Sequence, residues 1–320
     1  MVDICEIVRD QFTEVKALLD HIALHIAVPD AHPAPQWTVR EAYRHCITVA
    51  QSHYENFPVV SFFLRRSERR ALAAFYTFAR VADDIADRPD LPLTTSQRLA
   101  ALDRLETAIA QRQPVHPFLE AVYDSMERYQ IPPSIFHRLL IAFRYDLNFR
   151  PFPNWEQVQW YCHHSADPVG EAVLLIARQH RRSMLPFSDA LCTALQLINF
   201  WQDLATDRQR RRCYIPEQVL RAVGASVEDF YHRRLTHSQQ HHILKQVLEI
   251  TRFFLNKAAI LPALLTGRWR LFLKLIFGGA SVMVEKLQAA GTCLFVADRI
   301  LLHNRDFLRI FTNGIKRRAK

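Results

Sequence analysis

Apolar residues recur at spacings of three and four along almost the whole chain, and no segment sustains the two-residue alternation of a half-buried strand. Proline-rich breaks such as RPDLPL (88 to 93) and RPFPN (150 to 154) divide this pattern into segments of ordinary helix length. Glycine, with 7 residues in a chain of 320, is too scarce to favour Gly-rich nucleotide-binding loops. The sequence therefore predicts an all-α fold of about a dozen helices.

The same breaks indicate the domain organisation. The segment PDAHPAP (29 to 35) ends the first helical stretch, so residues 1–35 are predicted to form a helical N-terminal extension. Residues 36–320 contain no repeat and no long polar linker, which predicts one domain. Thr38 and Glu41 form a capping box, which predicts that the first helix of this domain begins beside them.

The cysteine spacing and the N-terminal sequence favour a cytoplasmic protein. The 6 cysteines include no CxxC pair, so neither a zinc site nor a disulfide framework is indicated. The first residues, MVDICEIVRD, have acids where a signal peptide needs a basic segment. Basic residues interrupt the apolar stretch LLTGRWRLFLKLIFGGASVMV (264 to 284), so it predicts no spanning helix and remains compatible with contact at a membrane surface.

The chain is basic, with a formal net charge of +9. Its basic residues cluster in RRSERR (65 to 70), RQRRR (208 to 212) and KRRAK (316 to 320). Such clusters fit nucleic acid, anionic lipid or a phosphorylated substrate, and charge alone does not separate these partners. Each cluster taken alone is also typical of a solvated surface.

One acidic motif lies within the apolar stretch ALAAFYTFARVADDIAD (71 to 87). Tyr76, Arg80, Asp83, Asp84 and Asp87 share one face of the predicted helix, because residues three and four apart are neighbours on a helix. Two carboxylates one turn apart destabilise a helix unless a cation answers them. Arg80 or a divalent metal can supply that charge; alternatively, the acids simply end the helix and face water.

A second polar face follows in LCTALQLINFWQDLATDRQRRRCYIP (191 to 216). Gln196, Asn199, Asp203 and Asp207 fall at helical spacing, and an arginine-rich segment follows at once. Mg²⁺ prefers oxygen ligands and is usually held by one or two carboxylates together with phosphate oxygens. Two such helices are predicted to hold Mg²⁺ and a diphosphate, with arginines 80, 208, 211 and 212 offsetting phosphate charge. The chemistry that this indicates is ionisation of an allylic diphosphate, with aromatic side chains sheltering the carbocation.

Three motifs resemble those of a known family. YTFARVADDIAD (76 to 87) and QLINFWQDLATDRQRRRCYIP (196 to 216) resemble the two aspartate-rich motifs of the head-to-head prenyl synthases, the squalene and phytoene synthase superfamily. YCHHSADPVGEAVL (161 to 174) resembles the motif that lies between them. The resemblance covers roughly residues 38 to 290. It implies a single-domain isoprenoid synthase fold over residues 36–320, in which a helical bundle surrounds a central cavity.

The resemblance also implies roles for individual residues. Five carboxylates match the metal-binding positions for Mg²⁺: Asp83, Asp84, Asp87, Asp203 and Asp207. The residues expected to act on the reacting groups are Tyr76, Arg80, Tyr161, Asn199 and Arg212. The residues expected to bind the substrate are His53, Asn56, Phe57, Gln196 and Tyr214.

Within the superfamily, SHYENFPVVSFFL (52 to 64) and RYDLNFRPFPNWEQ (144 to 157) look most like the bacterial hydroxysqualene synthases of hopanoid biosynthesis. That resemblance implies Mg²⁺-dependent ionisation of presqualene diphosphate, rearrangement of the cation and capture by water to give hydroxysqualene. The implied pathway partners are a presqualene diphosphate synthase and a flavin-dependent squalene reductase. The long hydrocarbon product and the C-terminal sequence FLRIFTNGIKRRAK (307 to 320), apolar and then basic, predict that this cytoplasmic protein makes peripheral contact with the inner face of the membrane.

An alternative activity remains open from the sequence. Two farnesyl diphosphates condensed to presqualene diphosphate, squalene or dehydrosqualene would need the same metal-binding residues. Asn56 and Phe57 stand where carotenoid-type relatives have Ser-Phe, and Met283 stands where some have tyrosine. Both departures disfavour carotenoid-type condensation more than hydroxysqualene formation.

Non-enzymatic and other metal-binding classes fit less well. A di-iron bundle needs Glu-x-x-His pairs, and no glutamate in this chain has a histidine three residues later. The segment HSQQHH (237 to 242) is more typical of a solvated helix face than of a metal site. A basic helical protein that binds nucleic acid or membrane explains the charge but not the paired aspartates, which repel a phosphate backbone, so no nucleic-acid partner is predicted.

Overall fold

The computed structural model describes residues 4–31, 35–52, 63–297, 299–303, 305–306 and 309–310, with side chains from residue 13 onward. Within these residues the regular secondary structure is helical and no strand occurs, as the apolar periodicity predicts. None of the described helices has the length and apolar character needed to cross a lipid bilayer. The chain divides into two compact units, which are described in turn: Met1–Asn148 with Ala172–Gln179, and Phe149–Glu171 with His180–Lys320. The division between an N-terminal extension and a synthase domain at residue 35 remains a prediction.

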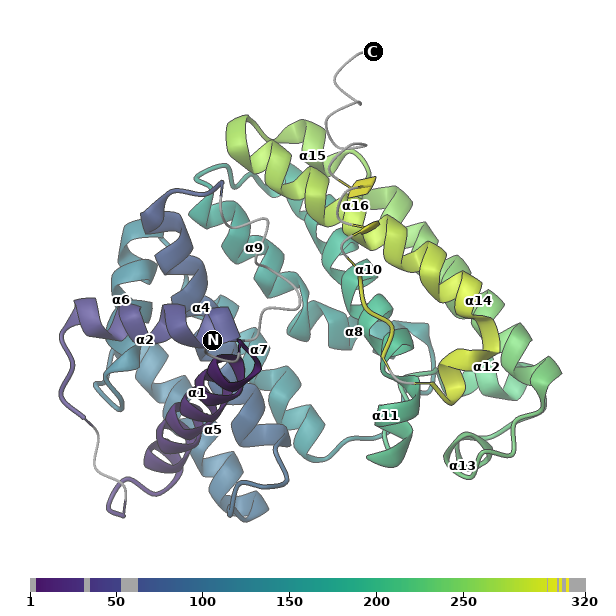
Figure 1. Ribbon diagram of the computed structural model, residues 1–320, viewed down its shortest axis with the longest axis horizontal. Coiled ribbons are helices and arrows are strands. Elements are labelled where there is room, and N and C mark those ends of the chain that lie inside the picture. The colour runs from purple at the N-terminus through teal and green to yellow at the C-terminus, as the bar shows by residue number, and fades with distance from the viewer. Residues whose placement is uncertain are drawn as a thin grey trace. The chain divides into compact units, whose positions relative to one another are not determined.

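The first unit is built around one long helix. Its helices are α1 (Ile4–Ala27), α2 (Val39–Ser52), α4 (Arg66–Asp87), α5 (Thr95–Gln111), α6 (Phe118–Tyr129) and α7 (Pro133–Leu147). Helix α4 contacts each of the other five (Figure 1). Phe78 of α4 is fully buried and meets Phe136 of α7 edge to face, with ring centroids 4.8 Å apart. The polar face of α4 is therefore fixed by burial of its opposite face.

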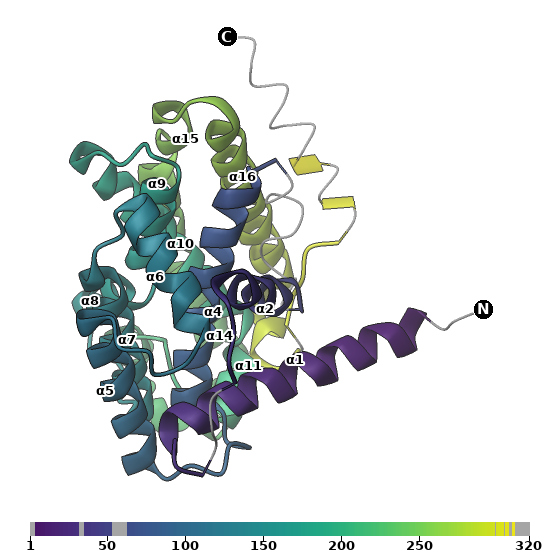
Figure 2. The ribbon, with the colours of Figure 1, turned by 90° about the vertical axis from the view of Figure 1, so that its left-hand side faces the viewer.

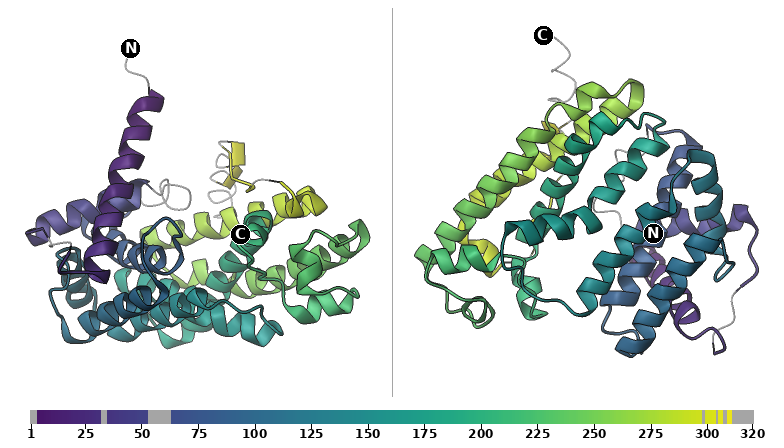
Figure 3. Two further views of the ribbon diagram at one scale, coloured as in Figure 1. Left: turned by 90° about the horizontal axis from the view of Figure 1, so that it is seen from below. Right: turned by 180° about the vertical axis from the view of Figure 1, so that it is seen from behind.

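Helix α1 packs on this unit through its C-terminal half. Val15, Leu19, Ile22 and Ile26 are buried, whereas the first turns of the ribbon extend away from the other helices of the unit (Figures 2 and 3). Arg104 of α5 donates hydrogen bonds to the last carbonyl groups of α1, at Ile26 O (2.8 Å) and Ala27 O (2.7 Å). These bonds satisfy groups that a helix end leaves without partners.

The second unit is built around α10 and α14. Its helices are α8 (Trp155–Ser165), α10 (Leu185–Gln202), α11 (Leu204–Gln209), α12 (Glu217–Ala222), α13 (Val227–Tyr231), α14 (His237–Ala258), α15 (Leu261–Leu264) and α16 (Gly267–Ala290), with 3₁₀ turns η1 (Arg182–Met184) and η2 (Gly291–Phe295). Helix α9 (Asp167–Ile176) contains the boundary between the units. Helices α10, α14 and α16 contact one another (Figure 3). Trp201 of α10 is fully buried and donates its indole N–H to Thr251 of α14 at 2.9 Å.

Candidate functional site

The first acidic motif ends helix α4. The helix starts where Glu68 accepts a hydrogen bond from the backbone N–H of Arg65, at 2.6 Å, and it stops at Asp87 before the proline-containing turn. Arg98 of α5 holds this end, because its guanidinium donates to Ile85 O (2.6 Å), Arg88 O (2.7 Å) and two further carbonyls of the turn. The acidic end of α4 is thus rigidly attached to α5.

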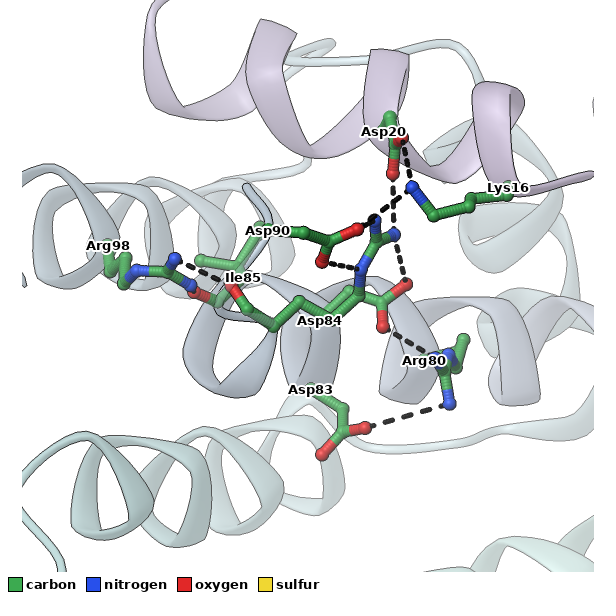
Figure 4. A network of polar contacts seen from close by, with 9 residues as sticks. Lys16, Asp20, Arg80, Asp83, Asp84, Ile85, Asp90 and Arg98 are labelled. Atoms are coloured by element: carbon green, nitrogen blue, oxygen red, sulfur yellow. Dashed lines mark hydrogen bonds and ion pairs between the residues drawn. The ribbon is translucent and has the colours of Figure 1, made fainter. Parts of the chain in front are cut away.

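The three aspartates of this motif differ in their surroundings. The side chain of Asp84 has 0% exposure, and its carboxylate lies 2.7 Å from Nη2 of Arg80 and 3.6 Å from Nη1 of Arg88. Asp83 is 43% exposed and lies 3.9 Å from Arg80, and Asp87 is half-buried. Figure 4 shows the carboxylates of Asp84 and Asp83 each joined to Arg80 by an ion pair. Asp83 and Asp87 are therefore the more accessible of the three aspartates in this motif.

Tyr76 lies on the same helix, one turn before Arg80. Burial raises the pKa of its phenol to about 12, although the charge of Arg80 opposes the shift. The phenol therefore stays protonated at neutral pH and has an O–H that can donate a hydrogen bond.

The second polar face is not carried by one continuous helix. Helix α10 ends at Gln202, Asp203 forms a bend, and α11 begins at Leu204. The backbone nevertheless keeps its helical spacing, because Asp203 N donates to Asn199 O (3.0 Å) and Asp207 N donates to Asp203 O (2.8 Å). Aspartate is a weak helix former, which is consistent with a bend at this position. Gln196, Asn199, Asp203 and Asp207 are all partly exposed.

A C-terminal segment contacts this second motif. Arg299 lies 3.3 Å from the carboxylate of Asp203 and donates to Asn199 Oδ1 at 3.5 Å. Gln202 donates to Ile300 O, and Arg208 donates to Phe295 O at 2.6 Å. Arg299 is not among the site residues that the sequence predicts. The sequence around Arg299, LFVADRILL (294 to 302), gives no signal of this contact, because its partners lie about a hundred positions earlier in the chain.

The arginines in the last turn of α11 and directly after it make different contacts. Arg208 is buried and holds the C-terminal segment, and burial lowers the pKa of its guanidinium. Arg211 pairs with Glu228 at 3.2 Å and lies over the ring of Tyr231. Arg212 lies over the ring of Phe149, 5.9 Å from its centroid. Of arginines 208, 211 and 212, Arg212 is therefore the one that lies beside the aromatic side chains around Tyr214.

Aromatic side chains gather around two of the predicted site residues. Tyr214 stacks on Phe200 of α10, with ring centroids 4.0 Å apart, and Tyr161 of α8 lies 6.2 Å from Tyr214. Phe149 and Phe152 complete this cluster, each within 6.0 Å of Tyr214. The structure therefore brings Tyr161, Tyr214 and Arg212 close together. The faces of aromatic rings such as these attract cations.

The central motif brings α9 close to α10. A Cβ atom on Gly170 would meet Ser188 Oγ at 2.4 Å and Cys192 Sγ at 2.6 Å, so only glycine fits at this position. Asp167, at the start of α9, accepts a hydrogen bond from Thr193 (3.4 Å) and lies 3.4 Å from His163. These contacts fix the motif against α10, and with it the end of α8 that carries Tyr161.

The predicted site residues thus fall into three groups. Tyr76, Arg80 and the DDIAD aspartates (83, 84 and 87) share α4 in the first unit, whereas Tyr161, Gln196, Asn199, Asp203, Asp207, Arg212 and Tyr214 lie in the second. His53, Asn56 and Phe57 lie outside the described residues. Among the described residues no three His, Cys, Asp or Glu side chains form a complete metal site. The assigned roles remain predictions.

A family model described as squalene/phytoene synthase matches residues 50–306. The chain is 38% identical to hydroxysqualene synthase from Zymomonas mobilis over 178 residues, which cover 55% of this chain and 59% of that protein. It is 39% identical to hydroxysqualene synthase from Rhodopseudomonas palustris over 178 residues, with the same coverage of 55% and 59%. The chain therefore spans less than two thirds of the length of these curated relatives.

Solved structures show the same architecture. The crystal structure of squalene synthase HpnC from Alicyclobacillus acidocaldarius is 30% identical, covers 79% of this chain and 95% of its own, and has a TM-score of 0.72. A dehydrosqualene synthase, 17% identical, covers 87% of this chain and 97% of its own, with a TM-score of 0.76. These similarities confirm the predicted all-α isoprenoid synthase fold.

Proposed function

Because the chain belongs to the squalene/phytoene synthase family, we propose that it ionises presqualene diphosphate in a Mg²⁺-dependent reaction that yields hydroxysqualene and diphosphate. The names of its relatives support this choice, since two of them are hydroxysqualene synthases with 38% and 39% identity. The observation on which the proposal rests is that a partly exposed carboxylate lies beside an arginine in each of the two acidic motifs. Asp83 and Asp87 lie on the helix of Arg80, and Asp203 lies beside Arg299.

The donor set fits Mg²⁺. This ion prefers carboxylate oxygens and completes its six ligands with water and substrate phosphate oxygens, so an incomplete protein site is expected. We propose that Asp83 and Asp87 of the first unit, and Asp203 and Asp207 of the second, are the Mg²⁺ ligands. When bound, Mg²⁺ supplies electrostatic stabilisation of the negative charge on the departing diphosphate.

The protein's own side chains would act on the leaving diphosphate and on the carbocation. Arg80, Asn199 and Arg212 would hold the leaving diphosphate through charged and polar hydrogen bonds. The carbon–oxygen bond breaks with its electron pair on the diphosphate, and the cyclopropylcarbinyl cation rearranges beside the aromatic cluster of Tyr161 and Tyr214. Water then forms the new carbon–oxygen bond and loses one proton to solvent. Tyr76, which stays protonated, would orient that water or the diphosphate by donating its O–H.

The substrate and product define the neighbouring reactions. A presqualene diphosphate synthase would supply the substrate, and a flavin-dependent squalene reductase would consume the hydroxysqualene. Because both compounds carry long apolar chains, we propose a cytoplasmic enzyme in peripheral contact with the inner face of the membrane. Exposed Phe253 (61%) and Ile260 (49%), with Lys257 between them in sequence, provide an apolar and basic edge for such contact.

The direct test is to incubate the purified chain with Mg²⁺ and either presqualene diphosphate or farnesyl diphosphate, and to identify the product by mass. The proposal predicts hydroxysqualene and pyrophosphate from presqualene diphosphate and no turnover of farnesyl diphosphate. Squalene, dehydrosqualene or presqualene diphosphate formed from farnesyl diphosphate would favour the condensation reaction instead. No turnover of either compound, together with salt-sensitive binding of random DNA, would favour a basic binding protein.

A further inference from the structure

Helix α1 and the end of α4 are joined by a line of alternating charges. Lys16 and Asp20 project from α1, and Asp90 lies in the turn after α4 (Figure 4). Arg88 is central to this line, because Nη1 lies 2.5 Å from Asp20 and Nη2 lies 2.9 Å from Asp90. Lys16 lies 2.8 Å from Asp90 and 3.4 Å from Asp20.

The same guanidinium also reaches the acidic motif. Nη1 of Arg88 lies 3.6 Å from Oδ2 of Asp84, whereas Arg80 lies 2.7 Å from Oδ1. The Asp84 side chain is fully buried, and the Arg88 side chain is only 15% exposed. A single buried carboxylate therefore lies between two guanidinium groups, one predicted to bind diphosphate and one held by α1 and Asp90.

This arrangement affects how much charge Arg80 can offer a ligand. A carboxylate paired with one arginine neutralises the charge of that guanidinium group. A carboxylate shared between two arginines leaves each guanidinium group with excess positive charge. The next acid near Arg80 is Asp83, at 3.9 Å, which is at the outer limit of an ion pair. Arg88, in contrast, has further partners in Asp20 and Asp90 that keep it in place.

We propose that Asp84 serves as the shared counter-ion of Arg80 and Arg88 rather than as a Mg²⁺ ligand, and that Arg88 is a positioning residue that keeps the charge of Arg80 available to the substrate diphosphate. Helix α1 takes part through Asp20, which orients Arg88. This proposal rests on the proposed function, because it assigns Arg80 to the diphosphate. It also assigns a role to an element that precedes the family match at residue 50.

The test is isothermal titration of the full chain with inorganic pyrophosphate in the presence of Mg²⁺, which needs no turnover. Arg88→Gln should raise the Kd about tenfold, because Arg80 must then neutralise Asp84 alone. Arg88→Lys keeps the charge but cannot contact Asp20 and Asp84 together, so it should raise the Kd about threefold. Arg112→Gln is the matched control. Arg112 forms an ion pair with the exposed Glu127, at 3.4 Å, so this variant should leave the Kd unchanged.

The double variant Arg88→Gln/Asp84→Asn separates charge sharing from a structural effect. It removes the buried negative charge together with its second partner, so the Kd should return close to the wild-type value. The proposal would be overturned if Arg88→Gln had the wild-type Kd for pyrophosphate. It would also be overturned if the double variant bound pyrophosphate as weakly as Arg88→Gln does. If Arg88→Gln does not fold, an unchanged Kd for Arg88→Lys would overturn it. Failure of the wild-type chain itself to bind pyrophosphate would instead show that the proposed function is wrong.

Discussion

The carboxylate of Asp84 lies 2.7 Å from the guanidinium of Arg80, and none of its side chain is exposed. Asp83, its neighbour in sequence, is 43% exposed. Successive residues on a helix point about 100° apart, so adjacent acids of one motif face different surroundings. The motif DDIAD therefore combines an acid that maintains the structure with acids that can reach a ligand.

Substitution of these acids should separate stability from activity. Asp84→Asn should lower the free energy of unfolding by about 3 kcal/mol, because it leaves two guanidinium groups without their buried partner. Asp87→Asn should lower kcat by about a hundredfold or more through loss of a metal ligand, with little change in stability. Urea denaturation and pyrophosphate release measure the two effects.

The control for this pair is Asp103→Asn, the same change at a carboxylate that is 68% exposed and pairs with Arg144. It should change neither stability nor turnover appreciably. Full activity of Asp87→Asn would remove Asp87 from the predicted metal ligands. An Asp84→Asn variant as stable as Asp103→Asn would contradict the structural role of Asp84.

Arg299 should affect metal and diphosphate binding in opposite directions. Its guanidinium lies 3.3 Å from Asp203, so in the absence of substrate it competes with a cation for that carboxylate. Arg299→Gln should therefore bind Mn²⁺ alone more tightly and bind Mg²⁺-pyrophosphate more weakly, each by about three- to tenfold. Titration calorimetry measures both constants, and a change of the same sign in both would show that Arg299 does not act by its charge.

Gly170→Ala should destabilise the second unit. Its Cβ would lie 2.4 Å from Ser188 Oγ and 2.6 Å from Cys192 Sγ, and such overpacking costs about 1 to 3 kcal/mol. The matched control is Gly279→Ala in α16, where the new Cβ would meet Leu302 at an ordinary 3.8 Å. Thermal unfolding should show a lower Tm for the first variant and an equal or higher Tm for the second. Recovery of the Tm on adding Ser188→Ala and Cys192→Ala to Gly170→Ala would confirm the steric cause.

Much of the fold and part of the site follow from the sequence. The all-α class and the break after Asp87 are confirmed, and Glu41 accepts from Thr38 N at 2.9 Å where α2 begins, as the capping box predicts. These features depend on spacing and on neighbours a few residues away, which the sequence displays directly. The shared polar face of α4 follows from the same local geometry.

The remaining features depend on distant segments. The difference in burial between Asp83 and Asp84 arises from packing of α4 against other helices and cannot be read from the motif itself. The bend at Asp203 interrupts a stretch that periodicity predicts to be continuous. The pairing of Arg299 with Asp203 joins two parts of the chain that share no sequence pattern. Such contacts are set by the tertiary structure, which local spacing does not specify.

Acid should destabilise the first unit through His116. Its ring is fully buried, and burial, followed by the nearby charges of His25, His21 and His45, lowers its pKa to about 3. The unfolded chain binds this proton near pH 6.5, so stability is present above that pH and is lost as the pH falls from 6.5 towards 3. His116→Asn, which keeps an acceptor for the N–H of Phe118, should weaken this dependence by up to about 1.4 kcal/mol per pH unit. Urea unfolding at pH 7 and pH 5 measures the change in the free energy of unfolding between the two pH values. The same change in the wild type and in His116→Asn would contradict the prediction.

The proposed function requires that the acids of α4 and those at Asp203 and Asp207 both serve as ligands of the catalytic Mg²⁺. The most direct measurement is a crystal structure with Mn²⁺ and a non-reactive thiodiphosphate analogue of the prenyl substrate, with the metal located by anomalous scattering. We expect Mn²⁺ ions that contact the analogue's phosphate oxygens, with Asp83 or Asp87, and also Asp203 or Asp207, among the metal ligands. Metal and diphosphate bound by only one of the two motifs, or by neither, would contradict it.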